Sequence, residues 1–322
     1  MHRLIGLGIL VVLFALPSIA FAQTEDVCGS DERTAAYTDY YNKKKKGDAP
    51  AQKEAYGLGK QYLQKWSQCN DQYSQAVQKF VAAYEAANAE TDLRLMVFGA
   101  TPNYPQAMEL GKKILANKPD DLNTLMTLGY AGYLALTKGN KALAPDAITY
   151  LRKSLELIDS GKTPPNWNPF KSKEEAIGLI NFSLGEFTSA ANNDAAGSLP
   201  YYVKAATTEG PTKKLAVVYG RLATVYEGIV EQLNKDYNTT YGGKPETDQS
   251  KAAFEKVNQA VDRLIDYYAR AVNLAGNDPQ LAAHKASWLE RLTVLYKLRH
   301  EDKTDGLEAM MGNVINTPLP PP

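Results

Sequence analysis

The residues best suited to acid-base or metal chemistry are few in this sequence and do not form a recognisable set. His284 and His300 lie near the end of the chain, and neither belongs to a nucleophile and base pair. His300-Glu301 begins like a zinc-binding helix motif, but Thr304 stands where the second histidine would be. We therefore expect a protein that is not an enzyme and that needs no metal and no cofactor.

Two cysteines, Cys28 and Cys69, offer the other chemistry that the sequence suggests. A disulfide between them would close a loop of about forty residues and would stabilise the fold by roughly 4 kcal/mol in the chain-entropy model. Two free thiols are an alternative, and a metal pair is a poorer one because no histidine lies nearby. We predict a disulfide that acts as a structural staple and not as a redox centre.

The first 22 residues have the form of a secretory signal. His2-Arg3 precedes an apolar run over residues 4–16, and Ala20-Phe21-Ala22 supplies a cleavage site before Gln23. A retained membrane anchor is the alternative, but spanning a bilayer takes about 20 apolar residues. We predict export to the periplasm or the outside of the cell, with no membrane insertion after signal cleavage.

The charge balance limits the kinds of partner. Basic and acidic residues are equal in number, at 36 each, which argues against a nucleic-acid partner. The run Lys43-Lys44-Lys45-Lys46 is a local exception, and we interpret it as a solvated helix end.

Helical spacing of apolar and small residues is the main pattern in the chain. Residues 54–63 keep such residues three and four apart, residues 67–72 are turn-like, and Tyr73, Ala76, Phe80 and Ala83 then form one stripe of a second helix. Further helical segments are predicted over residues 93–98, 107–116, 122–133, 147–155, 174–187, 200–206, 215–233, 253–274 and from about 280 to 298. The polar residues 236–250 are predicted to be a flexible loop.

The motifs in these segments resemble those of the tetratricopeptide repeat family. Leu58-Gly59-x-x-Tyr62, followed by Tyr73-x-x-Ala76-x-x-x-Phe80-x-x-Ala83, is similar to the two helices of one repeat. Leu128-Gly129, Leu184-Gly185 and Leu222-Ala223-x-x-Tyr226 resemble first-helix signatures, while Tyr202-x-x-Ala205 and Tyr268-x-x-Ala271 resemble second-helix endings. The resemblance covers about residues 50–280 and implies an all-α solenoid of antiparallel helix pairs in a right-handed superhelix. An ordinary helical bundle is the alternative fold.

Three tyrosine doublets occur within the predicted helices: Tyr40-Tyr41, Tyr201-Tyr202 and Tyr267-Tyr268. Adjacent helical residues point about 100° apart, so each doublet can place one ring in the core and one outside. Both rings of a doublet can instead close gaps between helices.

The resemblance also implies where a ligand would bind. First-helix residues that flank the small packing residues would line the inner surface of the repeats, and for this groove we name Lys60, Gln64, Asn123, Tyr130 and Tyr133. An extended peptide or a partner helix would suit such a groove.

The sequence thus divides into five segments with different expected roles. They are a signal peptide (1–22), an amino-terminal helical extension (23–52), helical repeats (53–280), carboxyl-terminal capping helices (281–312) and a proline-rich tail (313–322). The tail is expected to be of polyproline type, either as a disordered end or as a ligand for a groove of another copy.

The expected function is non-catalytic binding. We predict an exported scaffold that binds a protein or peptide partner through a curved groove. The alternative is a self-associating structural subunit of an envelope or extracellular assembly.

Overall fold

The computed structural model describes residues 27–321, and its regular elements over that range are all helices. Helices adjacent in sequence pack on one another, as in a helical solenoid, so the predicted all-α class is confirmed. The predicted signal and its cleavage site before Gln23 lie outside the described residues. Two compact units make up the chain, Met1–Asn88 and Ala89–Pro322.

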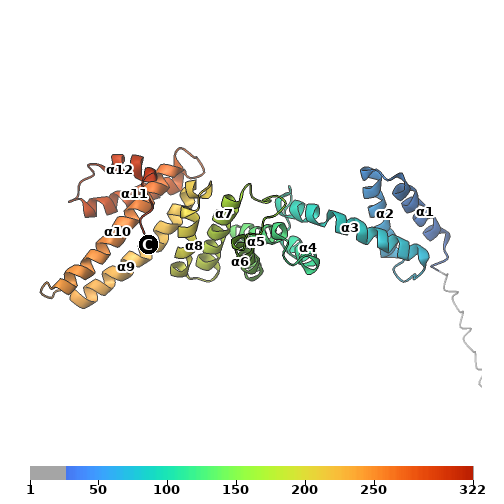
Figure 1. Ribbon diagram of the computed structural model, residues 1–322, viewed down its shortest axis with the longest axis horizontal. Coiled ribbons are helices and arrows are strands. Elements are labelled where there is room, and N and C mark those ends of the chain that lie inside the picture. Colours follow the sequence, from blue (N-terminus) through green and yellow to red (C-terminus); the bar gives the residue numbers. More distant parts are fainter. Residues whose placement is uncertain (1–26, 322) are drawn as a thin grey trace, which may run out of the picture. The chain divides into compact units, whose positions relative to one another are not determined.

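The first unit contains α1 (Asp31–Lys46), α2 (Ala49–Lys65) and the first part of α3 (Gln72–Phe98) (Figure 1). The Ser30 and Asp48 side chains accept hydrogen bonds from backbone amides in the first turns of α1 and α2. The basic run forms the last turn of α1, where positive charge is favoured by the helix dipole. The core of this unit consists of Tyr40, Ala55, Tyr62, Trp66, Cys69, Val77 and Val81.

The buried face of α3 differs from the predicted stripe. Tyr73 is 46% exposed and Ala83 is also exposed, whereas Val77 and Val81 are buried. The two valines pack on Gly59 of α2, where an added Cβ would lie 2.9 Å from a Val81 methyl carbon. The prediction of the stripe was therefore wrong at Tyr73 and Ala83, whereas Phe80 is half-buried and packs against the core beside the valines.

The predicted break before residue 93 is also absent. One helix runs through Phe98, so residues 93–98 belong to α3 and are not a separate helix. The intervening residues, 84–92, contain no glycine or proline and several alanines, so nothing in them ends a helix.

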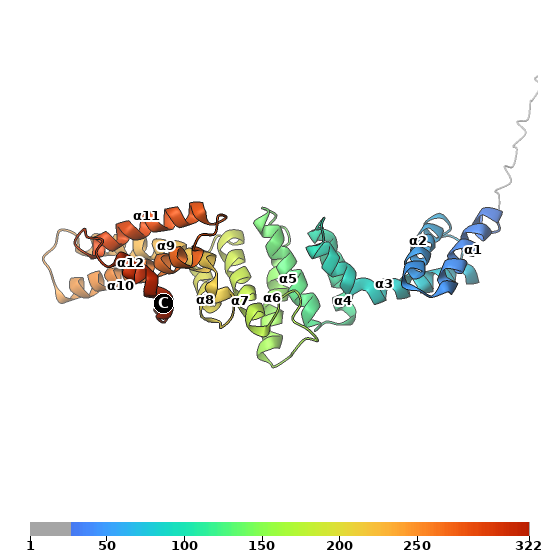
Figure 2. The same cartoon turned by 90° about the horizontal axis from the view of Figure 1, so that it is seen from above.

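Besides three short π- and 3₁₀-helical segments, the described residues of the second unit form the end of α3 and nine further α-helices (Figures 1 and 2). These are α4 (Tyr104–Asn117), α5 (Leu122–Thr137), α6 (Ala144–Asp159), α7 (Lys173–Glu186), α8 (Ala195–Thr207), α9 (Ala216–Tyr241), α10 (Asp248–Ala275), α11 (Ala282–Arg299) and α12 (Leu307–Asn313). The closest packing joins α5 to α6, α7 to α8 and α9 to α10, and α5 also touches α7. We call α5, α7 and α9 the first helices of these three pairs, and α11 the first helix that follows them.

Glycines in the first helices allow these pairs to approach closely. A Cβ added to Gly185 in α7 would lie 2.5 Å from the ring of Tyr202 in α8. Gly129 in α5 is packed in the same way against Leu151 of α6. Helix axes come within about 8–10 Å only where the side chains between them are small.

The predicted flexible loop over residues 236–250 is largely helical. α9 continues to Tyr241 and α10 begins at Asp248, so six residues connect two long antiparallel helices (Figure 2). Thr247 and Ser250 form a reciprocal capping box that starts α10. The ring of Tyr237 packs 5.3 Å from that of Phe254 across the two helices. Capping and aromatic packing explain why this polar segment folds.

Candidate functional site

A cluster of three polar side chains joins α7, α8 and α9. The Tyr202 hydroxyl donates to Glu186 Oε1 at 2.6 Å, and Arg221 donates to both oxygens of Glu186 at 2.7 and 2.9 Å. The Glu186 side chain is 12% exposed, whereas that of Arg221 is 52% exposed. The carboxylate is thus held inside, and the guanidinium faces outward.

A second cluster repeats the arrangement one helix pair further along. The Tyr268 hydroxyl of α10 donates to Glu227 of α9 at 3.1 Å, and Arg291 of α11 donates to both Glu227 oxygens at 2.7 Å. In each cluster a first helix supplies the carboxylate, its paired helix supplies the tyrosine, and the next first helix supplies the arginine. We call them the acid–tyrosine–arginine clusters.

Burial and charge fix the protonation of these groups. Burial, followed by the nearby carboxylate, raises the pKa of Tyr202 and of Tyr268, so both remain hydroxyl donors at neutral pH. The hydrogen bond from Arg291 lowers the pKa of Glu227, which therefore stays ionised. Neutral tyrosines and an ionised glutamate are suited to holding a guanidinium in place.

Aromatic side chains continue from the first cluster toward α5. The ring of Phe182 lies 5.9 Å from Tyr202 and 6.1 Å from Tyr133, and Tyr133 lies 5.5 Å from Tyr130. Tyr130 and Tyr133 are half-buried, and burial raises the pKa of Tyr133 to about 12. The structure therefore brings these two predicted groove residues together beside the first cluster. We use the name first-helix row for Tyr130 and Tyr133 of α5, Arg221 of α9 and Arg291 of α11.

Asn123, also on α5, makes its side-chain contacts to the loop between α6 and α7. Its amide nitrogen lies 3.0 Å from the carbonyl oxygen and 3.0 Å from the side-chain oxygen of Asn166, and 2.9 Å from the carbonyl oxygen of Asn168. With its donors used in this way, Asn123 fixes the loop between α6 and α7.

The remaining predicted groove residues, Lys60 and Gln64, lie in the first unit and are not part of the first-helix row. Both are exposed on α2, and the Lys60 ammonium lies 5.5 Å from the ring centre of Tyr56. The five named residues are thus divided between the two units, two in the first and three in the second.

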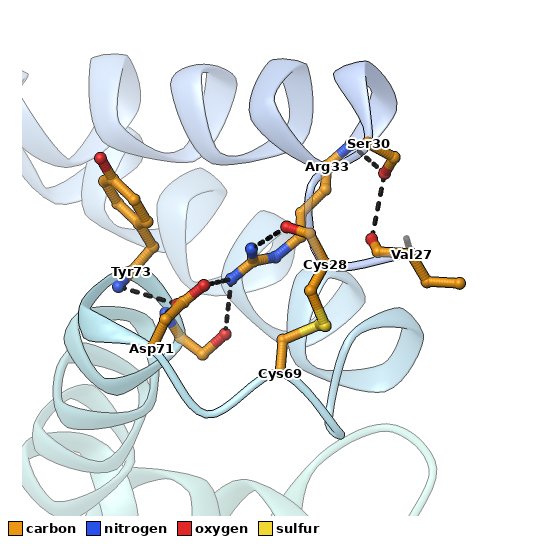
Figure 3. Close-up of a disulfide and its surroundings, with 8 residues drawn as sticks. Val27, Cys28, Ser30, Arg33, Cys69, Asp71 and Tyr73 are labelled. Carbon is orange, nitrogen blue, oxygen red and sulfur yellow. Dashed lines mark hydrogen bonds and ion pairs between the residues drawn. A yellow bond between two sulfur atoms is a disulfide. The ribbon is translucent and has the colours of Figure 1, made fainter. Parts of the chain in front are cut away.

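The predicted disulfide between Cys28 and Cys69 is present in the first unit (Figure 3). Beside it the buried Arg33 guanidinium donates to the Cys28 carbonyl oxygen, to Asp71 Oδ2 at 2.6 Å and to Ser74 Oγ at 3.0 Å. The sequence did not indicate Arg33.

The charged members of the clusters were also missed by sequence reasoning, although both tyrosines had been noticed as second-helix residues. Glu186 follows Leu184-Gly185 directly, and Glu227 follows the tyrosine of Leu222-Ala223-x-x-Tyr226. A carboxylate close behind these two motifs was the available signal, although none follows Leu58-Gly59 or Leu128-Gly129 in the same way.

Over residues 27–321, no group of three or more His, Cys, Asp or Glu side chains is arranged to hold a metal ion. Over the same range, no helix is both long and apolar enough to cross a membrane. Comparison with known proteins finds no family model, no curated protein and no solved structure that matches the chain.

Proposed function

We propose that this protein is an exported, non-catalytic scaffold of tetratricopeptide-like repeats that binds a protein or peptide partner through its first-helix row. The secretory pattern of residues 1–22 and the Cys28–Cys69 disulfide support export, since disulfides persist in oxidising compartments. The neighbour-to-neighbour packing of helix pairs supports the repeat assignment.

The repetition of the acid–tyrosine–arginine cluster is the observation that carries the proposal. Arg221 and Arg291 each use Nε and Nη2 on a glutamate, and Nη1 of each finds no acceptor among residues 27–321. A partner's carbonyl or carboxylate oxygen can accept from this remaining edge. Because each guanidinium is already held in position, little side-chain entropy is lost on binding.

The aromatic end of the row adds apolar contact area. Tyr130 and Tyr133 are half-buried, and tyrosine and arginine are enriched among residues that dominate binding energy at protein interfaces. A ligand with apolar groups near α5 and acceptor oxygens near α9 and α11 would match the row.

The test is recovery of a partner by the mature chain from native envelope and medium fractions. The double variant Arg221→Ala/Arg291→Ala is compared with wild type, and Arg299→Ala is the control because Arg299 makes a similar bidentate pair with Asp262 outside the two clusters. We expect wild type and control to recover the same stoichiometric partner, and the double variant to recover at least tenfold less. Equal recovery by all three proteins would refute the proposal.

Self-association is the second candidate function, and an apolar side of α11 favours it. Val294 and Leu298 are four residues apart and are 52% and 72% exposed. Terminal helices of soluble repeat arrays usually present a polar outer face. Light scattering over a range of concentrations tests this candidate: a large homo-oligomer that Leu298→Glu dissociates would support it, and a monomer at all concentrations would exclude it.

A further inference from the structure

The carboxyl-terminal segment 317–321 is extended and lies against α10 of the same chain. The guanidinium of Arg270, a residue only 4% exposed, donates through Nη2 to the carbonyl oxygens of Thr317 and Pro318 at 3.0 and 2.9 Å and to the Thr317 hydroxyl at 3.1 Å. Arg270 Nε donates to Asp266 Oδ1 at 2.6 Å, which anchors the guanidinium on its own helix.

Two further contacts hold the segment. Arg263 donates to the carbonyl oxygen of Pro321 at 2.6 Å, and the Leu319 side chain packs against the main apolar cluster of the second unit. The segment is thus bound through backbone carbonyl groups at both ends and one apolar side chain between prolines. Recognition of this type applies to extended, proline-containing peptides, which lose little conformational entropy when they bind.

The segment supplies most of the acceptors of Arg270 Nη2. If the segment leaves, Arg270 keeps both hydrogen bonds to Asp266, but Nη2 loses the three acceptors that Thr317 and Pro318 provide. A charged donor that loses acceptors gains from new ones, so the carbonyl oxygens of another extended peptide would be favoured there. A cleft of about 530 Å³ adjoins the segment and is lined by Ala206, Lys213, Tyr219, Leu274 and Leu319, among others.

We propose that the surface of α10 around Arg270 is a binding site for an extended, proline-containing peptide of a partner. Segment 317–321 of the same chain occupies this site and competes with the partner's peptide for it. The resting chain is closed at this site, and release of the segment opens it. This site shares no residue with the two acid–tyrosine–arginine clusters, so its absence would leave the function proposed for the first-helix row unaffected.

The test uses a chain that ends at Asn316 and a fluorescently labelled peptide of residues 316–322, with binding followed by fluorescence anisotropy. We expect the shortened chain to bind the peptide at least tenfold more tightly than the full-length chain does. Arg270→Lys in the shortened chain, which keeps the charge but not the forked donors, should weaken binding at least tenfold. The same change at Arg299 is the matched control and should leave binding unchanged.

Folding of the variants is checked by circular dichroism. If the shortened chain loses its helices, full-length Leu319→Asp replaces it, because that change removes the apolar anchor and leaves the backbone intact. Leu319→Asp should then bind the peptide more tightly than wild type. The proposal would be overturned if wild type and the folded variant bind the peptide equally, or if Arg270→Lys leaves peptide binding unchanged. Dimerisation of the full-length chain that Arg270→Lys abolishes would also overturn it, in favour of exchange of the segment between copies.

Discussion

Single small residues decide how closely paired helices approach in the second unit. Gly185 lies under the ring of Tyr202, which is almost fully buried and donates to Glu186. The position of this glycine thus also sets where the tyrosine hydroxyl can reach the carboxylate. The packing of Gly185 against Tyr202 is therefore coupled to the position of the Glu186 carboxylate that holds Arg221 of the first-helix row.

Replacing Gly185 with alanine should lower the free energy of unfolding by about 1–3 kcal/mol, because the added methyl group overlaps the Tyr202 ring. Gly228→Ala is the matched control within α9, since nothing lies within 4 Å of its added Cβ. Alanine is the better helix former, so the control should gain up to about 1 kcal/mol. Urea denaturation measures both, and a Gly185 variant as stable as its control would contradict this account.

The Glu227–Arg291 pair predicts a dependence of stability on pH. The hydrogen bond from Arg291 lowers the pKa of Glu227 in the folded chain, so the unfolded chain takes up this proton first as the pH falls. The stabilisation is present above the unfolded pKa of about 4.3 and is lost as the pH falls through the lower folded value. Unfolding free energies measured from pH 6 to pH 3 should fall less steeply for Glu227→Gln than for wild type. Identical slopes would rule out this contribution.

The helix pair of α9 and α10 differs in burial along its length. The buried residues of α9 lie between Ala216 and Tyr226, and those of α10 resume at Val257 after the cap residue Ser250. The distal parts of both helices and the connection over residues 242–247 are mostly exposed. Contacts to the rest of the unit therefore stabilise only the proximal half of this pair.

Amide hydrogen exchange should reveal this difference. We expect backbone amides of residues 232–256 to exchange faster than those of residues 257–275, because helices with few buried contacts open locally at low free-energy cost. Mass spectrometry of peptic fragments resolves the two regions. Uniform protection along α10 would show that the pair is stabilised by more than its proximal packing.

Much of the helical pattern was predictable because apolar spacing is local in the sequence. Residues 122–133 and 147–155 were placed correctly within α5 and α6 from that spacing alone. The face that a helix buries was harder to predict, since Tyr73 and Ala83 offer as regular a stripe as Val77 and Val81. The deciding contact is with Gly59, on another helix.

The tyrosine doublets show the same limit. Tyr40 is buried and Tyr41 is exposed, as a single buried face requires, but Tyr267 and Tyr268 are both buried. α10 has neighbours on several sides, which its own sequence does not reveal. The clusters depend still more on distant partners, since Glu227 and Arg291 are 64 residues apart.

At the scale of the whole molecule, the single disulfide belongs to one of the two units. Both cysteines and the Arg33 contacts lie within Met1–Asn88. Constraint of the unfolded chain by the disulfide should therefore stabilise the first unit directly.

Removing the disulfide with Cys28→Ser/Cys69→Ser should lower the stability of the first unit by roughly 4 kcal/mol and leave the second unit nearly unchanged. Trp66 is buried in the first unit and serves as its reporter once Trp167 and Trp288 are replaced by phenylalanine. Trp66 fluorescence should then change at a lower urea concentration than it does with the disulfide intact. The unfolding transition of the second unit, followed by far-ultraviolet circular dichroism, should stay at the same urea concentration. A common shift of both signals would contradict this assignment.

The order of side chains along the first-helix row has a consequence for any segment that lies on it. From α5 to α11 the row changes from aromatic rings at Tyr130 and Tyr133 to guanidinium groups at Arg221 and Arg291. A bound segment with an apolar end and an acidic end would match this order in one direction and oppose it in the other. The row therefore has a polarity, and it would distinguish a peptide from the same peptide with its sequence reversed.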